Sequence, residues 1–305
     1  GTENGTLKYK VEAGDLTFKK FVEGTLPGYT TDPATLSMTA DLANTGTDSN
    51  AVTMGSDQSN EAITVNLNGH NLTSAAASTI TINSGKTFNL NGGNATTDGT
   101  TDDKTGFSVA GTMNISGKTT INGTLSGAGA YNNSGTLNIA DASKLQMTGT
   151  DGLANTGTLN LGNATSSALG ANITGAGTTN IKGTVTSAKT IANKVTVESG
   201  KSFTTTGTVS GAVTNNGTFQ VDGGSTSGSV TNNLTMNITG GSVSGGISNA
   251  TTGTLTVSGG EVKTGAVTNA GTMNVTNGSV SSAVTNNKTL TLDGTGEISG
   301  AVTNA

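Results

Sequence analysis

Carboxylates are the side chains of this sequence that could act as acids or bases, or bind a metal ion. Glycosidic and general acid–base chemistry both require such groups to lie close together. From Asp151 onward the acids are spread over many coils of the repeat described below, at Asp151, Glu198, Asp222, Glu261, Asp293 and Glu297. This spacing predicts no catalytic pair there.

The one dense acidic group is Asp98, Asp102 and Asp103, in the stretch TTDGTTDDKTG. Calcium accepts oxygen ligands with loose geometry, so a Ca²⁺ ion near these residues is one interpretation. The spacing matches no calcium-binding loop, which favours a solvated loop and no cofactor. His70 is the only histidine; without a second histidine or a cysteine it predicts a turn residue rather than a zinc site or a triad.

An asparagine recurs in near-identical phrases such as VTNNGTFQV, VTNNLTMNI and VTNAGTMNV. Asparagine side chains satisfy backbone groups in turns, so a structural role is expected. Successive copies are separated by 17, 17, 20, 17 and 18 residues. The copies are Asn215, Asn232, Asn249, Asn269, Asn286 and Asn304.

Apolar residues alternate in the strand that follows each asparagine. In GTFQV, Phe219 and Val221 share one face, which we expect to point inward. A Gly-containing turn, a short Ser-rich strand and a strand with one apolar anchor follow. The equivalent inward pairs are Met236 and Ile238, Leu255 and Val257, Met273 and Val275, and Leu290 and Leu292. Three strands in a coil of about 17 to 22 residues predict a parallel β-helix.

The composition agrees with many short strands joined by turns. The chain has 47 Gly, 31% hydrophobic and 3% aromatic residues, so it cannot fill a wide core. Disorder is the alternative, but charged residues are only 11% and proline occurs twice. Crossovers between parallel strands are almost always right-handed, so we predict an all-β, right-handed parallel β-helix (β-solenoid).

Charge and hydropathy exclude several partners. The net charge is −5 and every base is Lys, so nucleic acid is not expected. No apolar run is long enough for membrane insertion of this segment. The absence of Cys excludes disulfides and thiolate metal sites.

The first residues differ from the repeats and contain both prolines. We therefore predict an irregular N-terminal cap, or accessory strands for contacts between subunits, over residues 1–61 and the β-helix over 62–305. A cap would prevent edge-to-edge growth.

The phrases TVNLNGHNLT, TITINSGKTFNL and VTNAGTMNV resemble the right-handed β-helices of bacterial surface adhesins and autotransporter passengers. The resemblance spans roughly Ala62 to Ala305. It implies an extracellular protein at the bacterial cell surface. It also implies that the repeated asparagines stack as a ladder inside a turn, bonded from coil to coil.

The two ends suggest a non-catalytic, self-assembling surface fibre that stacks head to tail. Leu7, Tyr9 and Val11 alternate as the inward pairs do, and we expect them to contact Val302 and Asn304 of another copy. The partners would then be copies of the chain, with glycans or proteins of the host or cell surface as further candidates. Alternatives are a stalk or passenger segment of a larger adhesin, a polysaccharide-active β-helix, or an ice-binding one with ranks of outward threonines.

Overall fold

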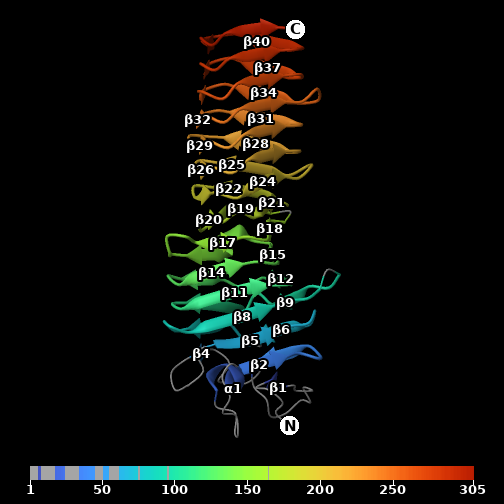
Figure 1. The fold of residues 1–305 in the computed structure, drawn as a ribbon, viewed down its shortest axis with the longest axis vertical. Helices are drawn as coiled ribbons and strands as arrows, with labels where there is room; N and C mark the ends of the chain where they lie inside the picture. Colours follow the sequence, from blue (N-terminus) through green and yellow to red (C-terminus); the bar gives the residue numbers. More distant parts are fainter. Residues whose placement is uncertain are drawn as a thin grey trace. The chain divides into compact units, whose positions relative to one another are not determined.

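The computed structural model describes residues 6–7, 18–24, 34–44, 51–54, 62–74, 76–94, 96–163 and 165–305. The chain forms two compact units, unit 1 (residues 1–159) and unit 2 (residues 160–305). In each unit short strands pair in parallel with strands of the preceding and following coil, as Figure 1 shows. The predicted all-β, parallel β-solenoid is therefore confirmed. Its right-handed winding stays a prediction.

The described residues of unit 1 form three sheets, here named A, B and C, with β18 (Thr158–Leu161) at the boundary of the unit. Sheet A consists of β1 (Thr6–Leu7), β2 (Ala34–Ser37), β5 (Ala62–Asn66), β8 (Thr87–Asn91), β11 (Thr112–Ser116), β14 (Ala130–Asn133) and β17 (Leu153–Asn155). Sheet B consists of β3 (Leu42–Asn44), β6 (Asn71–Ser74), β9 (Gly99–Thr101), β12 (Lys118–Ile121) and β15 (Thr136–Ile139). Sheet C consists of β4 (Ala51–Met54), β7 (Ser78–Ile82), β10 (Thr105–Val109), β13 (Leu125–Gly127) and β16 (Leu145–Met147), which follows the short 3₁₀ helix Ala142–Lys144.

Coil pairing in unit 1 begins before residue 62. Strands β2, β3 and β4 already pair in register with β5, β6 and β7. The short helix α1 (Phe18–Glu23) packs against β3 and β4, the first strands of sheets B and C. Phe18, Phe21 and Val22 are buried there, and the Glu23 carboxylate accepts a hydrogen bond from the Thr53 N–H at 3.2 Å. The helix therefore covers the first strands of two of the three sheets of this unit.

Unit 2 contains three sheets of eight strands, here named D, E and F. Sheet D consists of β20 (Ile173–Thr174), β23 (Thr190–Ile191), β26 (Thr208–Val209), β29 (Ser225–Thr226), β32 (Ser242–Val243), β35 (Glu261–Val262), β38 (Ser279–Val280) and β41 (Glu297–Ile298). Sheet E consists of β21 (Thr178–Ile181), β24 (Lys194–Val197), β27 (Val213–Asn215), β30 (Val230–Asn232), β33 (Ile247–Asn249), β36 (Val267–Asn269), β39 (Val284–Asn286) and β42 (Val302–Asn304). Sheet F consists of β19 (Ser166–Leu169), β22 (Thr184–Ser187), β25 (Ser202–Thr205), β28 (Thr218–Val221), β31 (Thr235–Ile238), β34 (Thr254–Val257), β37 (Thr272–Val275) and β40 (Thr289–Leu292).

The core of each unit is a set of apolar columns, because inward residues of successive strands lie in register. Phe219 stacks on Phe203 with ring centroids 5.6 Å apart and planes only 6° apart. The inward pairs predicted from Phe219 to Val275 are all buried. The exception is the last pair: Leu290 is half-buried and Leu292 is 55% exposed, although both lie in register with Met273 and Val275.

The repeated sequence phrase does not always occupy the same corner of the coil. In unit 2 the phrases of Val213 and later copies turn from sheet E into sheet F, whereas AGTTNI and IANKVTV enter sheet E. In unit 1 SVAGTMNI turns from sheet C into sheet A, and NNSGTLNI turns from sheet A into sheet B. The phrase is therefore a corner motif, whose position around the coil depends on the lengths of the intervening segments.

Candidate functional site

The predicted asparagines form a continuous side-chain ladder at the corner between sheets E and F of unit 2. Each Nδ2 donates to the Oδ1 of the asparagine in the next coil. From Asn215 to Asn304 the successive donor–acceptor distances are 2.7, 2.8, 2.7, 2.8 and 3.1 Å. The asparagines from Asn215 to Asn286 are buried, which makes the ladder an internal feature rather than a binding surface.

A second hydrogen bond ties each rung from Asn215 to Asn269 to the next coil. The Asn249 Nδ2 also donates to the carbonyl of Thr272 at 2.9 Å, and Asn232 and Asn269 donate likewise to Thr254 and Thr289 at 3.1 and 2.8 Å. Each acceptor threonine begins the sheet F strand of the following coil. Since a buried amide without partners costs free energy, these bonds hold the corner in one conformation. The ladder therefore has a structural role.

The described part of unit 1 contains a two-membered version of this ladder, formed by two asparagines other than the six predicted ones. The Asn133 Nδ2 donates to Asn155 Oδ1 at 2.7 Å and to the Thr158 carbonyl at 3.1 Å. Both asparagines are buried. The shared pattern of an asparagine two residues before Gly-Thr, in NSGT and NTGT, is the sequence signal that marks them.

The last coil of unit 2 exposes positions that are buried in the coils before it. Val302 is 43% exposed, whereas its register partner Val284 is 1% exposed. Asn304 receives the last ladder bond from Asn286 and is itself exposed. A further coil on β40, β41 and β42 would bury Leu292 and Val302 and extend the ladder.

The predicted contacts at the other end are described only in part. Leu7 lies in β1, whose backbone pairs with Leu36 of β2 within the chain. Tyr9 and Val11 lie outside the described residues. The contact of these residues with Val302 and Asn304 of another copy stays a prediction.

The acidic group near residue 100 is divided between protein partners. The Asp98 carboxylate lies 2.8 Å from Lys118 Nζ and accepts hydrogen bonds from Thr120 and Asn138, both at 2.9 Å. Asp102 instead accepts from the Ser74 N–H at 3.0 Å and the Thr105 hydroxyl at 2.6 Å. Within the described ranges no three acidic, His or Cys side chains gather as a metal-binding group, Asp103 included.

The Asp98 contacts change its acidity. Partial burial alone would raise the pKa of this carboxyl, but the hydrogen bonds from Lys118, Thr120 and Asn138 and the Lys118 charge outweigh it. The pKa of Asp98 is therefore held below its ordinary value, and the carboxylate fastens the segment before β9 to β12 and β15.

His70 occupies a turn, as the sequence predicts. It follows Asn68 and Gly69, which have φ of 52° and 82°. Its Nδ1 lies 3.6 Å from an Asp41 carboxylate oxygen. The N–H of Asn71 donates to the same carboxylate at 2.8 Å and is the main reason that the pKa of Asp41 lies below its ordinary value.

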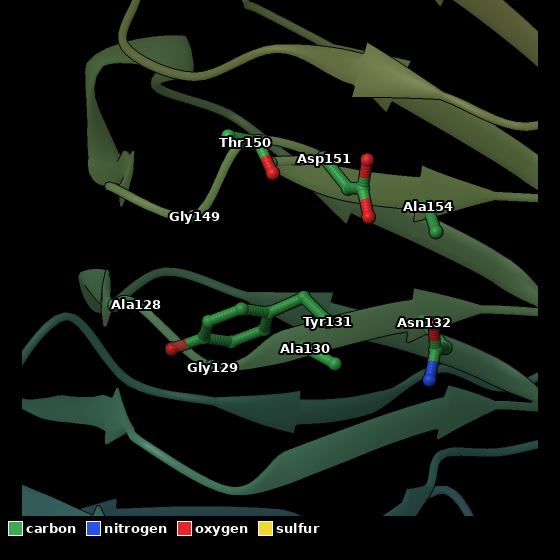
Figure 2. Close-up of a pocket in the computed structure, with 10 residues that line it drawn as sticks. Ala128, Gly129, Ala130, Tyr131, Asn132, Gly149, Thr150, Asp151 and Ala154 are labelled. Carbon is green, nitrogen blue, oxygen red and sulfur yellow. The ribbon is translucent and has the colours of Figure 1, made fainter.

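A crevice in unit 1 lies between two consecutive coils and is shown in Figure 2. Its walls are Ala128–Asn132 and Gly149–Gly152, with Ala154. The Tyr131 hydroxyl donates to the Ser126 carbonyl at 2.7 Å, and burial raises the pKa of this phenol. Asp151 is the other titratable residue of the lining. The titratable groups of the crevice are therefore one buried phenol and one carboxylate.

Comparisons with known proteins return no relatives. No protein-family model, no curated protein and no solved structure matches the chain. In the part of the chain that the structure describes, no helix has the length and apolar character needed to cross a membrane.

Proposed function

We propose that the chain is a non-catalytic structural segment of an extracellular bacterial surface protein, a rigid stalk of stacked coils. The observation that carries this proposal is the buried asparagine ladder, which ties successive coils of unit 2 by side-chain hydrogen bonds in addition to the backbone pairing. Such bonds contribute stiffness and no reactivity. The resemblance of the repeated phrases to adhesin and autotransporter β-helices supports the location.

The position of α1 favours a stalk over a head-to-tail fibre. A fibre joint would require the last coil of one copy to pair with the first strands of all three sheets of the next. Helix α1 packs on β3 and β4, and therefore obstructs two of those three sheets. Among the described residues, sheet A alone begins with an additional strand, β1, at that end.

A self-assembling fibre is the second candidate, because Leu292 and Val302 are exposed at positions that the preceding coils bury. The covering coil could belong to the same polypeptide in a longer protein or to another copy. Sedimentation velocity over a hundredfold range of protein concentration distinguishes the two candidates.

For a stalk we expect a sedimentation coefficient that does not change with concentration. The fibre would be favoured over the stalk if the protein formed large species at high concentration and Leu292→Glu abolished them. The control Thr285→Glu, at an exposed position of sheet E, would then still form them.

Location is tested by adding protease to intact cells of the source organism. Cleavage only after cell lysis would contradict a surface role.

A further inference from the structure

A shallow groove follows the corner between sheets F and D along unit 2. One segment of about 420 Å³ extends from Thr206 to Ser242 and includes Lys263. The next, of about 460 Å³, extends from Gly241 to Glu297, and Gly241 lines both. The groove therefore crosses six successive coils, which corresponds to about 24 Å at the spacing of neighbouring strands.

The floor of the groove is bare backbone that cannot accept side chains. A Cβ atom on Gly224 would lie 2.4 Å from the Gly207 carbonyl oxygen, and one on Gly241 would lie 1.9 Å from that of Gly224. The floor carbonyls are occupied, since the N–H groups of Ser225, Ser242 and Glu261 donate to Gly207, Gly224 and Gly241 at 2.8, 2.9 and 3.0 Å. The groove thus follows from close packing between coils.

One wall is a rank of polar side chains at the first position of the sheet D strands. They lie in register from coil to coil. The rank is Thr208, Ser225, Ser242, Glu261, Ser279 and Glu297. Hydroxyl groups and carboxylates therefore recur along the groove at the strand spacing of about 4.8 Å.

Side-chain contacts hold these walls in place before any ligand arrives. The Ser225 hydroxyl donates to Thr208 Oγ1 at 3.3 Å, and the hydroxyl of Thr295, another lining residue, donates to Asn277 Oδ1 at 3.1 Å. Glu261 accepts from the Ser281 hydroxyl at 3.1 Å and lies 3.7 Å from Lys263 Nζ. Preorganised donors and acceptors reduce the entropy cost of binding.

We propose that this groove binds a neutral, extended polysaccharide chain. The hydroxyl, amide and carboxylate groups of its lining can together donate to and accept from sugar hydroxyls, and the groove extends over several sugar residues. Two carboxylates and one lysine among its lining residues disfavour an anionic polymer. The inference goes beyond the structural role and does not depend on it, since either a stalk or a fibre would display the groove.

The experiment is isothermal titration calorimetry, which measures the dissociation constant of the full chain for each ligand. The ligands are a panel of neutral six-residue oligosaccharides, their two-residue counterparts and an oligomer of galacturonic acid. We expect at least one neutral hexamer to bind at least tenfold more tightly than its dimer, and the acidic oligomer to bind more weakly. Failure of every neutral hexamer to bind, or stronger binding of the acidic oligomer, would overturn the proposal.

Variants locate the binding. Ser242→Tyr fills the groove from its wall and should weaken the hexamer at least tenfold, whereas Thr231→Tyr, on the exposed face of sheet E, should not. Thermal melts check that both variants fold, and Ser279→Tyr replaces Ser242→Tyr if the latter does not. Unchanged affinity in the folded groove variant would contradict the site.

Discussion

At the scale of single residues, the interior asparagines should behave differently from those on the surface. Asn249→Ala removes one of the two acceptors of the Asn232 side-chain amide, which keeps its bond to the Thr254 carbonyl. It also removes the Asn249 donor to the side-chain Oδ1 of Asn269. We expect a loss of about 2 to 4 kcal/mol in the free energy of unfolding, because buried polar groups lose their partners. Urea unfolding followed by circular dichroism measures it.

The matched control is Asn274→Ala in the next coil, where the side chain is half-buried on the outer side of sheet F. This change should cost less than about 0.5 kcal/mol. Equal losses in the two variants would show that the ladder contributes no more than an ordinary surface amide.

The lowered pKa of Asp98 should make the stability of the fold depend on pH. Its pKa is lowered in the folded protein, so its stabilising contribution is fully present above the unfolded value of about 3.9 and is lost as the pH falls through the folded value. At pH 7, Asp98→Asn should therefore be less stable than the wild type, and the difference should shrink progressively below about pH 4.

Thermal melts at a series of pH values test this expectation. Asp103→Asn removes an exposed carboxylate from the same segment and serves as the control for the change in net charge. A deficit of Asp98→Asn that is the same at pH 7 and pH 2 would show that the Lys118 pair does not produce it.

At the scale of the element, the corners depend on glycines that differ in kind. Gly241 has φ of 70° and its added Cβ would meet backbone at 1.9 Å, whereas Gly223 has φ of 86° with nothing within 4 Å. Gly241→Ala should lower the free energy of unfolding by about 3 kcal/mol or more, because its Cβ clashes with backbone and its φ is positive. Gly223→Ala should lower it by about 1 kcal/mol, because only the positive φ is unfavourable there. Denaturant midpoints of the two variants compare them, and an equal shift would contradict the close packing of the groove floor.

Much at this scale could be predicted from the sequence, because strand alternation has a local period of two residues. The buried pairs from Phe219 to Val275 followed from it. The corner that a phrase occupies could not be predicted, since it depends on every segment length before it. Helix α1 could not be predicted either, because its six residues are too few to show a helical period. Its packing on β3 and β4 stabilises it, and local sequence does not reveal that packing.

Some of the candidate sites could likewise be predicted from the sequence, and others could not. The ladder could be anticipated because its asparagines repeat at nearly constant spacing. The groove could not, because Gly and Ser residues acquire a concave arrangement only when six coils are stacked in register. The Asp98 contacts with Lys118 and Asn138 join residues 20 and 40 positions away in the sequence, which local patterns do not reveal.

At the scale of the whole molecule, a structural role requires that the coils be held as a continuous stack rather than as independent strands. In unit 2 the β27, β30, β33, β36 and β39 strands are joined by backbone pairing and by the ladder. The last coil has a neighbouring coil on one side only within the described chain. Protection from exchange should therefore be high from β27 to β39 and lower in β40 to β42.

Hydrogen–deuterium exchange of the full chain, resolved by peptide, tests the central claim most directly. The account predicts that the amides of β27 to β39 exchange together and slowly, and that Asn249→Ala accelerates exchange in the coils on both sides of it. Exchange of these strands at the rate of an unfolded chain would contradict a rigid coil stack, and with it the proposed structural function.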